Sequence, residues 1–316
     1  MGFEVRPAAR KRVLARVSVI GPSGGGKTYS SIKFARGLAG PDGSIIVVDT
    51  EDSADMYEGL AGGFGVVSLP APYTIERYID AIDAAEKGFG DVPLDRRALV
   101  VDQVSFAWAG EGGLLEWVDS QQTSRGGKEG FAAWKKGTPL QNRFIQRLLA
   151  VRAHLIVTMR QKVEWVVEKN EKGFTEPRKV GLAPIQRPGT EYEFQIEFQL
   201  DQESHKARVT KDRTALFDGQ VFVPDVAHGA KLREFLLAGK GELLEPSPPP
   251  PPAAAKITAS QLQGLIVMAK SAGLDKGAFL DLVMSQAGHR VPGNLTEAEL
   301  ASLTSALDGL KALNGQ

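Results

Sequence analysis

The sequence feature that most constrains the fold is a glycine-rich loop, residues 21–28, set between an apolar β-branched run (residues 13–20) and a helix-like segment (residues 29–38). In such loops the backbone N–H groups turn toward phosphate oxygens, the lysine adds positive charge at the β- and γ-phosphates, and the threonine hydroxyl binds Mg²⁺. The N-terminus of the following helix faces the same anion. The sequence therefore predicts a site for a nucleoside triphosphate and Mg²⁺ formed by Gly21, Pro22, Ser23, Gly24, Gly25, Gly26, Lys27, Thr28 and Tyr29.

Composition narrows the functions open to the chain. The 316 residues include no cysteine, which excludes disulfides, thiolate nucleophiles and cysteine zinc sites. No apolar stretch is long enough to span a membrane and the N-terminus lacks an apolar signal region, so we expect a cytoplasmic protein with no membrane partner. Because 38 basic residues balance 38 acidic ones, any DNA site must be a local patch.

A proline run divides the chain into an ATPase domain (residues 1–244), a linker (245–256) and a small helical module (257–316). Apolar strand-like runs at residues 44–49, 65–69, 98–102 and 154–159 alternate with helix-like runs at residues 74–87, 113–121 and 131–151. Later runs at 163–167 and 178–182 flank a hairpin tip, and those at 192–200 and 207–211 resemble antiparallel strands. After the linker, residues 258–272, 276–286 and 296–313 have helical spacing. The predicted class is α/β, with a mostly parallel sheet, late antiparallel strands and an all-α C-terminal module.

Two carboxylates follow apolar strands, where the sheet brings them beside the phosphate loop. Asp102 ends the run 99–102 and is the candidate for the magnesium shell, the alternative being an ordinary strand-end aspartate. Glu51 follows the run 45–49 and is the candidate base that orients the attacking water. Asp49 fits a structural turn equally well.

These elements together resemble the RecA-type ATPase core, in which a glutamate at the position of Glu51 activates water. The runs 21–28, 49–54, 104–113, 156–160 and 178–184 resemble, more closely, bacteriophage RecA-like nucleotide-binding proteins found among recombination genes. This resemblance covers residues 13–219. It implies a phage or prophage protein that acts in the cytoplasm of a bacterial host.

The resemblance extends to a Lys-x-Arg strand end that RecA-like subunits insert into a neighbour's ATP site, here Lys211 and Arg213. It implies a homo-oligomer, a ring or a filament, in which both side chains act in trans; the alternative is two solvated charges. RecA places a glutamine that senses the γ-phosphate where this chain has Arg160-Gln161. Either residue is therefore a candidate sensor.

Loops after the later core strands hold DNA in RecA-like proteins, and two basic segments occupy such positions. Residues 124–136 carry Arg125, Lys128, Trp134 and Lys135, with the tryptophan available for base stacking. A mobile loop whose tryptophan packs on the core is the alternative. Residues 161–187 carry Lys162 and Trp165, but alternating charges there also fit a solvated hairpin.

The C-terminal module has balanced charge and leucines at helical spacing, which indicates a small core. It resembles helical modules of phage annealing and recombination proteins, so a single-strand-binding or annealing protein is the expected partner. A folded tail without a partner is the alternative.

We interpret the chain as an ATP-dependent protein that binds single-stranded DNA and assists annealing or strand exchange. The alternative is a nucleotide-gated switch or loader that recruits partners without remodelling DNA. A small-molecule kinase is disfavoured, because the sequence has no lid-like arginine cluster.

Overall fold

The structure is a computed structural model that describes residues 5, 7–121, 129–169, 175–248 and 257–314. The chain divides into two compact units, Met1–Pro249 and Pro250–Gln316. Each unit is described by itself.

A large sheet forms the centre of the first unit. Its parallel strands lie in the order β8-β2-β6-β5-β3-β4, and β9 and β10 continue it antiparallel beyond β8. The bounds are β2 Arg16–Gly21, β3 Ser44–Asp49, β4 Gly65–Ser68, β5 Arg97–Asp102, β6 His154–Lys169, β8 Ile196–Leu200, β9 Ala207–Asp212 and β10 Val221–Phe222. The predicted α/β class with late antiparallel strands is confirmed.

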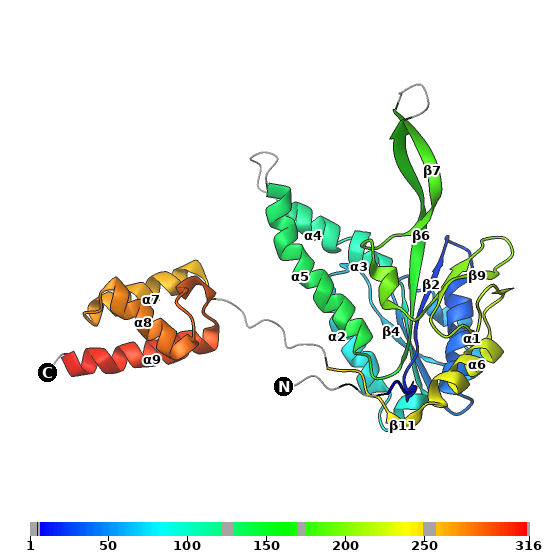
Figure 1. Ribbon diagram of the computed structural model, residues 1–316, viewed down its shortest axis with the longest axis horizontal. Helices are drawn as coiled ribbons and strands as arrows, with labels where there is room; N and C mark the ends of the chain where they lie inside the picture. Colours follow the sequence, from blue (N-terminus) through cyan, green and yellow to red (C-terminus); the bar gives the residue numbers. More distant parts are fainter. Residues whose placement is uncertain (1–4, 6, 122–128, 170–174, 249–256, 315–316) are drawn as a thin grey trace. The chain divides into compact units, whose positions relative to one another are not determined.

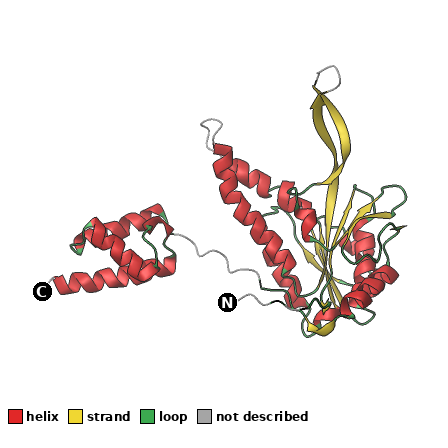
Figure 2. Ribbon diagram, in the orientation of Figure 1, coloured by secondary structure: helices red, strands yellow, loops and turns green. Residues whose placement is uncertain are grey.

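Helices cover both faces of this sheet (Figures 1 and 2). Helices α1 (Lys27–Ala39) and α6 (Val226–Leu237) share a core with Val47, whereas α2 (Ile75–Gly88) and α5 (Glu129–Leu149) share a core with Val48. Adjacent valines serve opposite cores because strand side chains alternate between faces. The alternation explains why the central strands are apolar throughout.

Helix α6 was not predicted from the sequence. It lies against α1 where two glycines meet: a Cβ on Gly37 would lie 2.1 Å from the carbonyl oxygen of Val226, and one on Gly229 would lie 2.1 Å from that of Phe34. The backbones therefore approach more closely than any side chain allows. This contact helps to hold α1, which carries the end of the phosphate loop.

Smaller elements complete the unit. Helices α3 (Ser105–Ala109) and α4 (Leu114–Ser120) lie between β5 and α5, and β1 (Lys11–Arg12) pairs in parallel with β11 (Lys240–Leu243). Short 3₁₀ turns span Ala54–Tyr57, Leu60–Gly62, Leu94–Arg96 and Thr190–Glu193. The last of these corrects the strand predicted from residue 192: a turn occupies its start, and the strand begins at Ile196.

Strand β6 continues past the sheet and pairs antiparallel with β7 (Thr175–Pro184), as the hairpin prediction required. Figure 1 shows this hairpin projecting well beyond the other strands, with the beginning of α5 projecting at the same end. Because β2, β3 and β5 run parallel to β6, their carboxyl ends face the same way. The predicted phosphate site and the described parts of both predicted DNA segments thus lie at one end of the sheet; residues 124–128 and the predicted hairpin tip, residues 170–173, lie outside the described residues.

The second unit is three helices, α7 (Ala259–Ser271), α8 (Lys276–Ala287) and α9 (Glu297–Asn314), with the short 3₁₀ turn Pro292–Asn294 before α9. Its core includes Leu265, Val283 and Leu303. Thr258 and Gln261 exchange the hydrogen bonds of a capping box at the start of α7. Among the described residues of both units, no helix is long and apolar enough to cross a membrane.

Candidate nucleotide site

The phosphate loop adopts a backbone conformation that depends on its glycines. Gly24 and Gly26 have φ of 76° and 81°, and a Cβ on Gly25 would lie 3.2 Å from the carbonyl oxygen of Pro22. The ammonium of Lys27 folds across the loop and donates to that same carbonyl at 2.9 Å. Burial lowers the pKa of Lys27, while nearby Asp102 and Glu51 act in the opposite direction. The loop can thus surround a polyanion and present a cation to it.

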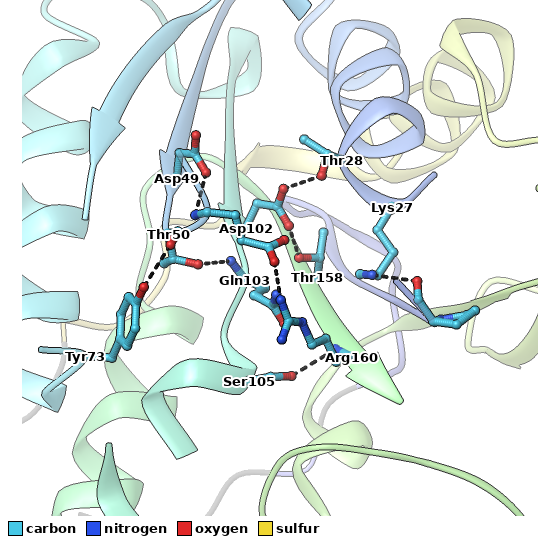
Figure 3. Close-up of polar contacts among 12 residues, drawn as sticks. Lys27, Thr28, Asp49, Thr50, Tyr73, Asp102, Gln103, Ser105, Thr158 and Arg160 are labelled. Atoms are coloured by element: carbon cyan, nitrogen blue, oxygen red, sulfur yellow. Dashed lines mark hydrogen bonds and ion pairs between the residues drawn. The ribbon is translucent and has the colours of Figure 1, made fainter. Parts of the chain in front are cut away.

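Asp102 lies at the centre of the polar contacts in Figure 3. Its carboxylate accepts a hydrogen bond at 2.5 Å from Thr28 and another from Thr158, and the residue is fully buried. Burial raises the pKa of Asp102, and the two hydroxyl donors offset this in part. A buried carboxylate beside the hydroxyl that follows the loop lysine is an oxygen donor set that suits Mg²⁺. The residues present therefore fit the expected metal.

Glu51, the candidate base, lies in the loop after β3 and forms an ion pair with Arg160 of β6. Two neighbours fix the arginine: its backbone N–H donates to the Ser105 hydroxyl at 2.9 Å, and its guanidinium lies 4.6 Å from the centre of the Phe106 ring. Gln161 points elsewhere, since its side-chain oxygen accepts from Gln199 at 3.3 Å. Of the two candidate sensors, Arg160 is the one in contact with Glu51.

Asp49 is the structural turn residue. Its carboxylate accepts from the backbone N–H groups of Glu51, Ser53 and Ala54 at 2.9, 2.7 and 2.7 Å. These bonds shape the loop after β3 and so aim Glu51. Asp49 thus bonds the backbone of its own loop, whereas the Glu51 carboxylate pairs with Arg160.

Two features near the loop were missed by sequence reasoning. Thr158 lies two residues before Arg160, so strand periodicity offered a signal for it. The turn between β8 and β9 gave no signal: Gln202 donates to the Ser23 carbonyl at 3.2 Å, and the His205 ring lies 3.5 Å from the Cβ position of Gly26. This turn borders the loop because β8 pairs with β2.

The buried side chain of Gln103 was also missed. It follows Asp102 directly, is 0% exposed, and neither of its amide atoms has a hydrogen-bond partner among the described residues. Its backbone N–H donates to the Thr50 hydroxyl at 3.0 Å. The contact ties the end of β5 to the loop that carries Glu51.

The remaining candidates that the structure describes make their contacts outside the loop. Lys211 donates to the carbonyl oxygen of Tyr192 at 2.6 Å and Arg213 donates to the same oxygen at 3.0 Å. Trp134 packs against Trp108, with 5.6 Å between ring centres. Exposed side chains include Lys135 and Lys162; Arg125, Lys128 and the side chain of Trp165 lie outside the described residues.

The fold and the site define a P-loop NTPase: a phosphate loop between β2 and α1, with a buried aspartate and a glutamate at the ends of two other parallel strands. Residues 14–215 match the family described as the AAA domain, and the chain belongs to that family. It therefore has the nucleotide-binding ATPase domain of that family. No curated protein matches this chain in sequence.

Three solved structures show distant likeness. The genome packaging NTPase of Sulfolobus turreted icosahedral virus 2, solved with AMP, is 13% identical over 59% of this chain and 74% of its own, with a TM-score of 0.28. A KaiC-like protein from Pyrococcus horikoshii OT3 is 13% identical over 65% and 89%, with a TM-score of 0.34. A type III secretion system ATPase of pathogenic bacteria is 12% identical over 94% and 80%, with a TM-score of 0.33.

Proposed function

We propose that this protein is a RecA-like ATPase of the kind encoded by bacteriophages, which binds single-stranded DNA when ATP is bound and assists annealing or strand exchange. One observation carries the proposal. Arg160 pairs with the candidate base Glu51 and stands where β6 passes from the sheet toward the projecting hairpin. A nucleotide-sensing residue and a candidate DNA-binding element are therefore consecutive parts of one strand.

The chain's own residues have distinct roles in hydrolysis. Backbone N–H groups of the loop bind the phosphates, Lys27 neutralises the β- and γ-phosphates, and Thr28 and Asp102 would hold Mg²⁺. A metal held by these two residues would supply positive charge to the phosphates. Glu51 orients the water that attacks the γ-phosphorus and accepts its proton.

Arg160 keeps Glu51 from orienting water until a γ-phosphate is bound. In the ion pair its guanidinium occupies the carboxylate that would orient water. A γ-phosphate is a competing anion with more charge, so ATP draws the arginine away and frees Glu51. The same arginine then stabilises charge that develops on the transferred phosphoryl group.

Single-stranded DNA would lie beside the hairpin and the beginning of α5. Exposed lysines there include Lys135, Lys136 and Lys162. Lysines that contact phosphates give binding that is independent of base sequence and weakens as salt rises. Trp134 is half-buried against Trp108, so only its free face is open to a base.

Lys211 and Arg213 would act in the site of a neighbouring subunit. Burial and the nearby Arg213 lower the pKa of Lys211, and its ammonium bonds to backbone carbonyls of its own chain. Exchanging neutral carbonyls for a γ-phosphate is favourable for both cations. Mixing inactive Lys27→Ala subunits, which keep Arg213, with Arg213→Ala subunits tests this role: restored ATP hydrolysis supports it, and no restoration contradicts it.

Steady-state ATP hydrolysis with and without a long single-stranded oligonucleotide, at two salt concentrations, tests the whole proposal. We expect stimulation that declines at the higher salt concentration. A Lys135→Glu, Lys162→Glu variant should lose the stimulation and keep the basal rate, whereas Lys240→Glu, an exposed lysine on β11, should behave as the parent. If ATP binds and DNA has no effect on the rate, the protein is instead a nucleotide-gated switch or loader.

A further inference from the structure

The second unit contains an apolar cavity that the nucleotide site does not use. Its volume is about 440 Å³, and it lies between the end of α7, the start of α8 and Pro292. Phe279 and Ala269 form a buried floor, while Ile266 is 38% exposed. A cavity of this size, built around one helix–helix turn, suits one large inserted side chain better than the long row of anchors on a helix face.

Basic groups outnumber acidic ones in the described lining of the cavity, with two lysines against one aspartate. Lys270 and Lys276 line the cavity, are exposed, and have no ion pair among the described residues. The third charged group at the rim, Asp275, is engaged: its carboxylate accepts from the backbone N–H of Ala278 at 2.8 Å and caps α8. The N-terminus of α8 adds positive potential at the same place.

These observations also disfavour other ligands. Among the described residues of the cavity lining, Phe279 is the only aromatic one; it is 7% exposed, so it offers no face for a nucleic-acid base. Two lysines are fewer than the basic cluster that binds an anionic membrane. An apolar cavity between two unpaired ammonium groups is complementary to an apolar side chain between carboxylates.

We propose that this cavity binds an acidic segment of another protein, which inserts one large apolar side chain while its carboxylates face Lys270 and Lys276. The lysines speed encounter and set orientation, and burial of the inserted side chain provides most of the affinity. This site is independent of ATP. Its failure and the failure of the proposed function are therefore distinguishable.

The test uses the full chain and a labelled synthetic peptide with one tryptophan flanked by aspartates, measured by fluorescence anisotropy. Two matched peptides replace the aspartates by lysines or the tryptophan by serine. We expect binding of the first peptide only. A Lys270→Glu, Lys276→Glu variant should weaken it about tenfold or more, which corresponds to roughly 1.4 kcal/mol, and Ile266→Ser should weaken it severalfold.

Lys311→Glu is the control, since it makes one substitution of the same kind at an exposed position of α9 outside the cavity lining. It should bind the peptide as the parent does. The proposal is overturned if no peptide binds, if the lysine-flanked peptide binds equally, or if the double variant retains full affinity. It is also overturned if the double variant instead changes the oligomeric state of the chain, because a second copy would then be the occupant.

Discussion

Arg160 provides the sharpest test of the proposed chemistry. The ion pair with Glu51 is partly open to solvent, with side-chain exposures of 37% for Arg160 and 29% for Glu51. A pair of this exposure contributes about 0.5–1 kcal/mol. A charged donor to the transferred phosphoryl group contributes roughly 3–4 kcal/mol in the transition state. The second contribution is larger, so moving the arginine from Glu51 to the transferred phosphoryl group lowers the barrier to hydrolysis.

Removing the side chain should therefore lower the rate. The variant loses the transition-state contact, but it no longer has to break the ion pair with Glu51. The difference between these two contributions is about 2–3 kcal/mol, so Arg160→Ala should lower kcat ~100-fold. Nucleotide affinity should change little, because Lys27 and the loop amides remain. Arg160→Gln should keep part of the activity, since an amide can still donate to the γ-phosphate and does not pair with Glu51.

The assay is steady-state hydrolysis together with ATP affinity from equilibrium binding. Arg143→Ala is the matched control: Arg143 is 38% exposed and forms an ion pair at 3.8 Å with Glu76, which joins α5 to α2. A rate for Arg160→Ala within twofold of the parent would refute the reasoning. A higher rate would refute it differently, because the arginine would then be only a restraint on Glu51.

Three further predictions follow from buried contacts. Gly37→Ala should destabilise the first unit by about 2–3 kcal/mol, because its Cβ would lie 2.1 Å from the Val226 carbonyl, whereas Gly264→Ala, with open space at its Cβ, should be neutral or stabilising in chemical denaturation. Burial lowers the pKa of His154 to about 3, so the unfolded chain binds more protons than the folded chain below pH 6.5. Chemical denaturation should therefore show a free energy of unfolding that is lower by roughly 2 kcal/mol at pH 5 than at neutral pH, and His154→Gln should remove this difference. Asp102→Asn should raise the melting temperature of the nucleotide-free protein, because burial raises the pKa of the Asp102 carboxyl and makes its ionised form costly. The same variant should abolish Mg²⁺-dependent hydrolysis. An unchanged melting temperature would contradict the first expectation.

Local sequence patterns were sufficient to predict many elements of the first unit. The phosphate loop, strands β3 and β5 and the hairpin were predicted because each carries its own signal: glycine conformations, unbroken apolar runs, or a charged tip between β-branched runs. Helix α6 has no comparable signal. It contains Gly229 and depends on the close approach of α1, which only the folded chain supplies.

The site shows the same division. Glu51 and Asp102 could be named as candidates because strand ends are recognisable in the sequence, but the contact that links Glu51 to Arg160 depends on β6 lying beside β5 and β2. The sequence left Arg160 and Gln161 as equal candidates for this reason. Alternation along a strand then separates them, since neighbours on β6 face opposite sides of the sheet.

Strand β6 is therefore the element on which the proposed coupling depends. Thr158 bonds Asp102 and Arg160 pairs with Glu51 on one side, Gln161 bonds Gln199 on the other, and the hairpin begins at Gln161, which lies opposite Pro184. A rigid strand transmits displacement along its length more directly than a loop does. We infer that DNA held by the hairpin changes hydrolysis through the position of Arg160. If so, DNA should no longer stimulate Arg160→Ala, even where that variant still binds the oligonucleotide; stimulation by the same factor as in the parent would show that the signal takes another route.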